Sequence, residues 1–239
     1  TTQVTSWALS LKPGQEGTTV YAPKTWSAPA DWSAGNVTVS WAGDSLAEKV
    51  FVVWEKETRE WYGFSTDTGN YLWKTEPQFY LDYHVATENA IAYGKLFSVG
   101  VSGIVYCYDL TTGQRAWTYK LSDPYQEILW ANDWWGQIMF IAGGKIYIGH
   151  SEHSPINPLP RGAPFTAIDI ETGEVVFRVD GMFRQTHWGG TAAIGDSIIA
   201  TQDSYDQRVY AVGKGPSALT ATAPNIGVDL GKSVVVTGT

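Results

Sequence analysis

The chain has 239 residues, of which 44% are hydrophobic and 14% aromatic, and its formal net charge is −8 at pH 7. That length and apolar content suffice for a continuous hydrophobic core in one large domain. The charge is acidic and no run of Lys and Arg offsets it, which excludes a nucleic-acid-binding surface, and no apolar stretch approaches the ~20 residues that a membrane-spanning helix needs.

The first predicted strand covers residues 7–11. Its sequence, Trp-Ala-Leu-Ser-Leu, resembles Trp-Thr-Tyr-Lys-Leu at residues 117–121, which closes one of the repeats described below. We therefore expect residues 1–35 to hold the outer strand of a preceding repeat and its connection. The triplet Asn36-Val37-Thr38 is a glycosylation-type sequon that hints at secretion.

One sequence pattern recurs three times, at residues 62–73, 106–117 and 166–177. Each copy predicts a strand, a tight turn that ends in Gly, and a second strand that opens with an aromatic residue. The Asp or Ser before the turn can accept hydrogen bonds from its backbone, and Gly adopts the positive φ that the turn requires. The turn glycines are 44 and then 60 residues apart, or 48 in the second case without a predicted 12-residue insertion at 151–162. These periods fit a four-stranded unit of ~40–50 residues.

A second hairpin precedes each turn, and the matched pairs define four repeats. The repeats are predicted at residues 36–76, 85–121, 136–179 and 190–222. With 12 Trp, 13 Tyr, 25 Gly and no helical periodicity, they predict an all-β fold. The expected architecture is a β-propeller with about four four-stranded blades, contained in residues 36–222.

The fourth blade ends at residues 212–216 without the Asp-to-aromatic turn of the others. Either the N-terminal strand completes it and closes a small ring, or the chain forms part of a larger ring. We favour the larger ring, because four blades are the lower limit of the usual ~4–8. Residues 223–239 depart from the repeat and predict a linker followed by the start of another β-domain.

These motifs resemble the pyrroloquinoline-quinone-like (PQQ-like) propeller repeat. The segment Asp109…Thr112-Gly113…Trp117 matches its signature fully, and the copies at 62–73 and 166–177 match with one substitution each. Residues 210–216 and the tail after them are also similar to secreted archaeal members of this group, in which an immunoglobulin-like domain follows the blades. The resemblance implies a propeller. The family's known members include quinone-dependent alcohol dehydrogenases and a noncatalytic lipoprotein of the bacterial outer-membrane assembly machinery.

The quinone chemistry of those dehydrogenases is not expected here. The resemblance implies a pair of adjacent cysteines over the quinone and a calcium held by acidic and amide side chains, whereas Cys107 is the only cysteine. No acidic cluster matches the calcium site. The acidic turn at residues 203–206 could offer oxygen ligands to calcium, but a solvated hairpin is the better interpretation. We therefore predict no cofactor, neither PQQ nor calcium.

The connections between blades are rich in aromatic residues, and in a propeller such connections gather near the central axis. Aligning the hairpins on Lys95, Lys145 and Ser197 places His84, Trp134 and Thr186 at equivalent positions. Aromatic faces with polar neighbours suit stacking on sugars or planar ligands. The alternative is that each Trp packs between blades, and that both His form structural hydrogen bonds. The predicted ligand-binding residues are His84, Asp133, Trp134, Trp135, Arg184, His187 and Trp188.

The insertion in the third blade carries three prolines, which stiffen it and lower the entropic cost of presenting a surface. His150, Glu152 and His153 could ligate zinc or copper, but a metal needs three or four converging donors and only two His are local. We predict no metal. A rigid loop that covers the channel or contacts a neighbour is expected instead, with His150, His153 and Arg161 at the interface.

The sequence thus favours a noncatalytic extracellular or cell-surface propeller that binds other protein chains or the remaining blades of its own precursor. A carbohydrate- or small-ligand-binding propeller that uses the aromatic face is the first alternative. A divergent quinoprotein-type enzyme is the second.

Overall fold

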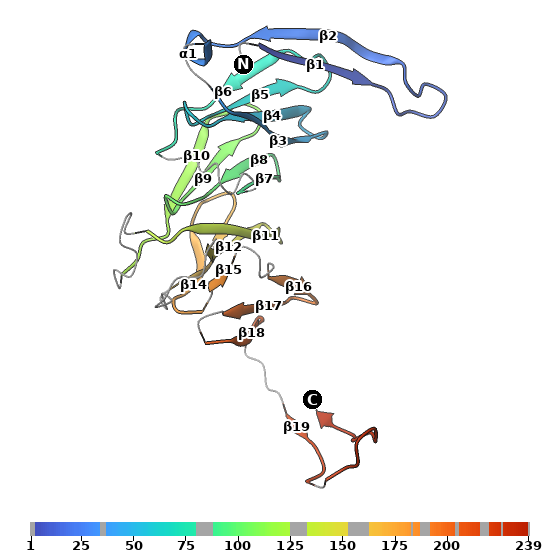
Figure 1. Ribbon diagram of the computed structural model, residues 1–239, viewed down its shortest axis with the longest axis vertical. Helices are drawn as coiled ribbons and strands as arrows, with labels where there is room; N and C mark the ends of the chain where they lie inside the picture. The colour runs from blue at the N-terminus through green and yellow to red at the C-terminus, as the bar shows by residue number, and fades with distance from the viewer. Residues whose placement is uncertain are drawn as a thin grey trace.

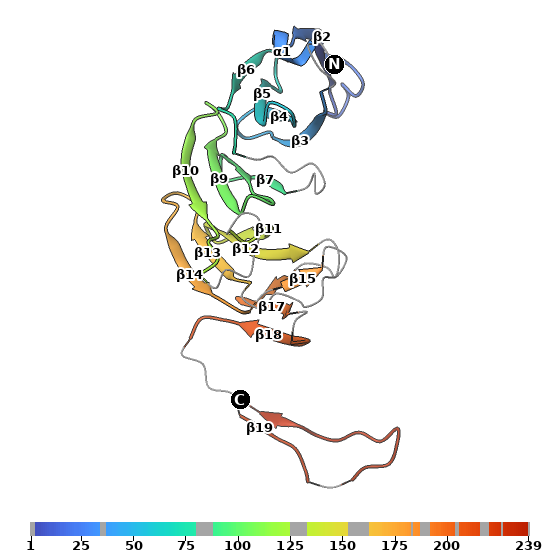
Figure 2. The ribbon, with the colours of Figure 1, turned by 60° about the vertical axis from the view of Figure 1, so that its left-hand side comes forward.

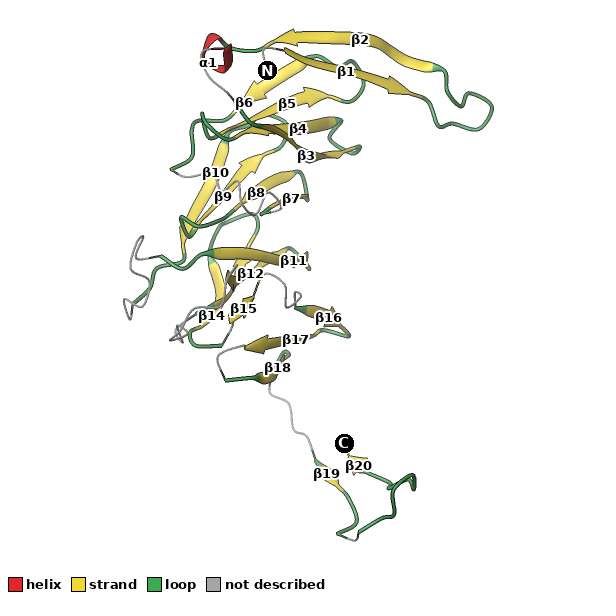
Figure 3. Cartoon of the chain, in the orientation of Figure 1, coloured by secondary structure: helices red, strands yellow, loops and turns green. Residues whose placement is uncertain are grey.

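The structure is a computed structural model, and it describes residues 3–33, 37–79, 88–124, 133–152, 163–182, 184–186, 192–203, 206–215, 220–225 and 227–238. Nearly every described element is a β-strand (Figure 3). The sheets follow one another along the long axis of the molecule, from the N-terminal hairpin to the fourth repeat (Figure 1). The predicted all-β fold with antiparallel four-stranded units is confirmed.

The first three repeats each form four antiparallel strands in simple sequence order, and the third sheet has a fifth strand, β15 (Arg184–Thr186), which pairs in parallel with its second strand. The first sheet contains β3 (Val39–Ser45), β4 (Val50–Glu55), β5 (Glu60–Ser65) and β6 (Tyr71–Lys74). The second contains β7 (Asn89–Ala92), β8 (Lys95–Ser98), β9 (Ile104–Asp109) and β10 (Arg115–Lys120). The third contains β11 (Gly136–Ala142), β12 (Lys145–Glu152), β13 (Phe165–Asp169) and β14 (Val175–Val179).

The fourth sheet has three strands among the described residues: β16 (Ala193–Gly195), β17 (Ile198–Asp203) and β18 (Arg208–Val212). This agrees with the missing Asp-to-aromatic turn in its sequence. The first strands of neighbouring sheets contact one another, β3 with β7 and β7 with β11. The last strands β6, β10 and β14 lie along the opposite side of the array (Figure 2). This is the inner-to-outer order of propeller blades.

The turns of the repeat have the predicted chemistry. The Asp109 Oδ1 atom accepts hydrogen bonds from the backbone N–H groups of Thr111 and Thr112, at 3.0 and 2.9 Å. Asp169 does the same for residues 171 and 172. The turn glycines adopt φ of 70° at Gly113 and 74° at Gly173, a region that residues with a side chain rarely occupy.

The tryptophan of each of the first two repeats fastens its sheet to the next sheet. The Trp73 indole Nε1 of the first sheet donates to the carbonyl of Leu110 in the second sheet at 2.9 Å. A Cβ atom added at Gly113 would lie 2.5 Å from the Trp73 ring, so the indole lies directly against the glycine. Trp117 repeats this arrangement on the third sheet, with a 2.9 Å hydrogen bond to the Ile170 carbonyl. The signature therefore encodes packing between blades as well as a turn.

The N-terminal segment forms a hairpin of β1 (Gln3–Leu9) and β2 (Thr19–Ser27), followed by the one-turn helix α1 (Ala30–Ser33). The hairpin lies against the first sheet, where an added Cβ at Gly69 would meet Ser6 and Tyr21 at 2.6 Å. Tyr21 thus contacts the first turn glycine as Trp73 contacts the second. That residues 1–35 complete a preceding blade stays a prediction.

The C-terminal strands β19 (Ala221–Thr222) and β20 (Thr237–Gly238) form a separate two-stranded hairpin, set apart from the stacked sheets (Figure 1). The prediction of a following β-domain at 223–239 is not tested by this small element. None of the helices in the described ranges is long and apolar enough to cross a bilayer.

Candidate functional site

Trp134, a predicted ligand-binding residue, lies in the core between the second and third sheets. Its side chain has no exposed surface and belongs to a cluster with Phe97, Leu121 and Ile148. Its backbone N–H donates to the carbonyl of Leu121 at 2.7 Å. A fully covered indole cannot stack on a ligand at the surface, so the packing alternative accounts for this residue.

Trp135 and His150 form a buried pair next to it. Trp135 is 8% exposed and His150 is 2% exposed. The His150 Nδ1 atom donates to the backbone carbonyl of Trp135, and its ring meets the Trp134 ring edge-on at 5.1 Å. His150 was predicted at a loop interface, but the structure places it in β12, where it ties the second strand of the blade to the first.

Asp133 and Arg184 lie at the margins of this region. Asp133 pairs with Ser122 in an isolated β-bridge, and burial raises the pKa of its carboxyl, an effect that Lys120 opposes. Arg184 begins β15 (Arg184–Thr186), which pairs in parallel with β12 and sets the Arg184 backbone opposite His150. No pattern in the sequence predicts this parallel strand.

The positive-φ turns correct one alignment made from sequence. Tyr93-Gly94 and Gly143-Gly144 both have positive φ, and so do Asp196 and Ser197. Ser197 is therefore a turn residue, and Ile198 rather than Ser197 corresponds to Lys95. Counting back from Ile198 makes His187, not Thr186, the sequence equivalent of His84 and Trp134.

The other predicted site residues lie outside what the structure describes. His84, His187, Trp188, His153 and Arg161 fall in gaps between the described ranges, and the side chain of Glu152 is likewise not described. Within the described ranges no three His, Cys, Asp or Glu side chains are grouped as a metal would require.

The described residues do not fit the quinone site that the resemblance implies. Cys107 is buried in the cluster between the second and third sheets, with its Sγ 4.0 Å from the Ile170 carbonyl. Burial raises the pKa of this thiol to about 12, so it stays protonated at neutral pH. A single thiol in this position cannot form the adjacent pair of those dehydrogenases.

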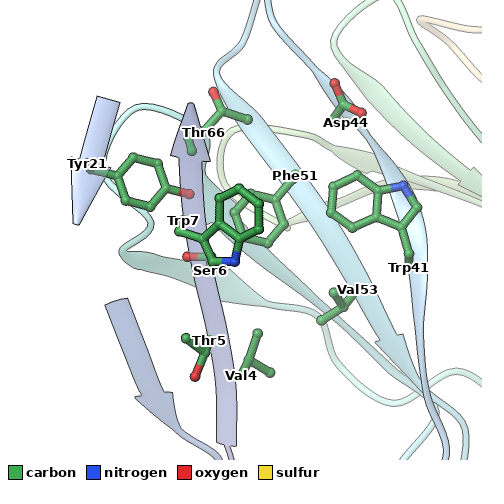
Figure 4. Close-up of a pocket in the computed structure, with 11 residues that line it drawn as sticks. Val4, Thr5, Ser6, Trp7, Tyr21, Trp41, Asp44, Phe51, Val53 and Thr66 are labelled. Atoms are coloured by element: carbon green, nitrogen blue, oxygen red, sulfur yellow. The ribbon is translucent and has the colours of Figure 1, made fainter. Parts of the chain in front are cut away.

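Sequence reasoning missed a pocket of about 420 Å³ between the N-terminal hairpin and the first sheet. Trp7 of β1 and Trp41 of β3 come from facing elements, and the Phe51 ring overlaps that of Trp7 in the view of Figure 4. The two indoles are 62% and 59% exposed. Asp44 and Thr66 supply polar groups at one end of the pocket (Figure 4). The sequence pointed to this pocket only through Trp7 and Trp41, which lie on strands and not in the aromatic connections between blades.

A larger groove of about 670 Å³ lies between the third and fourth sheets. Its described lining includes Tyr147, Phe177, Ile194 and Ile199, with Lys145 and Lys214 at the margins. On the opposite face of the fourth sheet, apolar side chains are strongly exposed, among them Ile198 at 52% and Val209 at 74%.

Comparisons with known proteins agree with this architecture. The family model described as outer membrane protein assembly factor BamB matches residues 24–215. No curated protein sequence matches the chain.

Three of the solved structures that match the chain have low sequence identity to it. The computationally designed Ika4 protein has a TM-score of 0.47 at 15% identity, over 74% of this chain and 92% of that one. BamB from Moraxella catarrhalis has a TM-score of 0.42 at 16% identity, over 83% of this chain and 54% of that one. A europium-containing methanol dehydrogenase has a TM-score of 0.40 at 19% identity, over 56% of this chain and 23% of that one. The chain therefore spans about half of the BamB structure and about a quarter of the dehydrogenase.

Proposed function

The chain belongs to the PQQ-like β-propeller repeat family whose model is described as outer membrane protein assembly factor BamB, and on that premise we propose that it is a noncatalytic binding module for another polypeptide. The binding site is the free edge of the fourth sheet. The polypeptide adds an extended strand there, with an aromatic side chain seated over Ala211. That strand comes from a partner chain or from the remaining blades of the same precursor.

The free edge of β18 carries this proposal. In the other three sheets the third strand is covered by a fourth, whereas β18 pairs on one side only, with β17, in the described part of the chain. An uncovered strand edge presents backbone N–H and C=O groups that a further strand can pair with.

The residue at Ala211 favours an aromatic side chain in the added strand. In the complete sheets the signature aromatic stands opposite a small residue: Trp73 opposite Gly63, Trp117 opposite Cys107, and Phe177 opposite Ala167. Counted from the turns, Ala211 holds the same place in β18. Those three small residues are buried, whereas Ala211 is exposed, and none of the described strands covers it.

A peptide with the sequence of residues 115–121 is a direct probe, because it is the fourth strand of the second sheet. We expect the labelled peptide to bind the intact chain in a fluorescence anisotropy titration, and a peptide with Ser in place of Trp to bind at least tenfold more weakly. Ala211→Leu fills the seat of the aromatic ring and should weaken binding to a similar degree. Gly227→Ala, in a described segment with open space around it, is the matched control. Equal binding of the two peptides, or no binding of either, would refute strand addition.

We also propose that the module works outside the cell or at the cell surface, as in the secreted archaeal proteins that it resembles. The sequon at Asn36 and the acidic composition support this. Detection of the protein in the extracellular or surface fraction of its source cells tests it, and recovery in the cytoplasm alone would refute it.

A further inference from the structure

The pocket between the N-terminal hairpin and the first sheet has the composition of an aromatic cage. Its volume of about 420 Å³ lies in the ~300–1,000 Å³ range of small-molecule sites. Four aromatic side chains line it: Trp7, Tyr21, Trp41 and Phe51. Trp41 stacks on Phe51 with ring centroids 5.5 Å apart and an interplanar angle of 18°, which fixes the orientation of this wall.

The two indoles are exposed although they are the largest apolar side chains of the pocket. Trp7 and Trp41 are 62% and 59% exposed, while Phe51 is buried at 7%. Exposing an indole forgoes the hydrophobic stabilisation that burying it would give. Because the two indoles come from facing elements and line the same pocket, their exposure marks a recess rather than two unrelated surface sites (Figure 4).

The charge of the pocket is negative. Among the described lining residues Asp44 alone is charged, and no Lys, Arg or His lines the pocket. In the described part of the chain no hydrogen bond or ion pair engages the Asp44 carboxylate, whereas Lys49 nearby is paired with Asp67 at 2.6 Å. The faces of aromatic rings are also electronegative, so rings and carboxylate attract the same kind of ligand.

Two hydroxyl groups in the pocket lining are poorly placed to bind a sugar. A sugar site needs donors and acceptors that are free to orient hydroxyl groups. The Thr5 hydroxyl is hydrogen-bonded to the Thr25 hydroxyl at 3.0 Å, and the Ser6 hydroxyl donates to the Gly69 carbonyl at 3.4 Å. Both hydroxyls are thus engaged within the protein.

From these observations we propose that the pocket binds a small organic cation with a substituted ammonium group. The ammonium group lies between the exposed faces of Trp7 and Trp41, Phe51 supports Trp41 by stacking on it, and Asp44 balances the charge. The site is independent of the strand edge on the fourth sheet, since it lies at the opposite end of the stacked sheets (Figure 1).

Choline and its neutral isostere 3,3-dimethyl-1-butanol test this directly, because they have the same shape and differ in charge. In calorimetric and tryptophan-fluorescence titrations we expect choline to bind and the isostere to bind roughly tenfold more weakly or worse. Equal affinity would show an apolar pocket and overturn the proposal. Binding of glucose or galactose but not choline, or of none of these compounds, would also overturn it.

Variants separate the parts of the cage. Asp44→Asn keeps the shape and removes the charge, and should weaken choline binding several-fold. Trp41→Leu should weaken it by roughly tenfold or more, because it removes an indole face. Asp196→Asn is the matched control, since Asp196 is exposed in a fourth-sheet turn at φ 47°, which Asn tolerates. Asp44 and Trp41 are exposed, so circular dichroism should show both variants folded. Unchanged choline affinity in both folded variants would refute the site.

Discussion

Replacing Gly113 by Ala tests whether the repeat signature fastens neighbouring sheets together. Gly113 has φ of 70°, and an added Cβ would lie 2.5 Å from Cε3 of the Trp73 ring. Gly144 offers a matched control with φ of 71° and no atom within 4 Å of an added Cβ. Both substitutions impose the same backbone strain, so the difference between them isolates the contact with Trp73.

The expected cost follows from the contacts that the new methyl group disturbs. An Ala in the left-handed region costs about 1–2 kcal/mol, partly offset by about 0.4–1 kcal/mol from the more restricted unfolded chain, so Gly144→Ala should cost about 1 kcal/mol. At Gly113 the indole must also move, which adds about 1–3 kcal/mol for overpacking. The movement also strains its hydrogen bond to Leu110, which adds about 1 kcal/mol.

The free energy of unfolding, measured in urea by tryptophan fluorescence, should therefore fall by about 2–4 kcal/mol more in Gly113→Ala than in Gly144→Ala. For a chain of this size the corresponding difference in Tm is roughly 4–16 °C. If the two variants unfold at the same urea concentration, then Trp73 does not pack against Gly113 and the proposed fastening is wrong.

Three further predictions concern the second and third sheets. Trp117→Phe removes the 2.9 Å hydrogen bond to the Ile170 carbonyl but keeps a ring, so thermal unfolding should show a loss of about 1 kcal/mol; no loss would contradict that bond. Burial raises the pKa of Cys107 to about 12, so a thiol reagent at pH 8 should label the protein only after denaturant is added, and rapid labelling of the folded chain would disprove this. Hydrogen bonds from Thr111 and Thr112 hold the pKa of Asp109 below its ordinary 3.8, so its stabilising contribution is present above that pH and is lost as the pH falls below it. Acid unfolding should therefore depend less on pH in Asp109→Asn, and an unchanged acid profile would count against this role.

The repeat turns were predictable because their chemistry is local. Asp109, Thr112 and Gly113 lie within five residues, and the hydrogen bonds and positive φ that join them need nothing from the rest of the fold. The aromatic that follows was predictable as a strand residue. The hydrogen bond from its indole to a carbonyl of the next sheet was not predictable, because that bond joins residues far apart in the sequence, 37 positions in the case of Trp73.

The environment of each Trp could not be predicted from alternation along a strand. Trp41 lies in β3 and Trp134 lies just before β11, yet Trp134 is fully buried and Trp41 is 59% exposed. The difference is whether another sheet covers that side: Trp134 lies between the second and third sheets, whereas Trp41 faces the recess under the N-terminal hairpin. The alignment of the fourth repeat with the others was equally hard to predict. It depends on Ser197 being a turn residue with positive φ, a conformation that is uncommon for Ser.

The two ends of the stack of sheets differ in how they are covered, and this difference favours the addition of a strand at one end only. On the first sheet the hairpin places Tyr21 against Gly69, which fills the position that a preceding blade's aromatic would take. On the third sheet Phe177 finds no corresponding turn glycine in the fourth repeat and packs instead near Phe165 and Tyr147, beside the groove. The first sheet is therefore closed by aromatic contacts, while the fourth offers apolar side chains and, among the described strands, an uncovered edge of β18. A partner that supplies one strand gains the ladder hydrogen bonds. Its aromatic covers Ala211 on one face of β18, and the side chains that alternate with the aromatic face the groove, which Val212 lines on the other face; this is why we place the binding edge at β18.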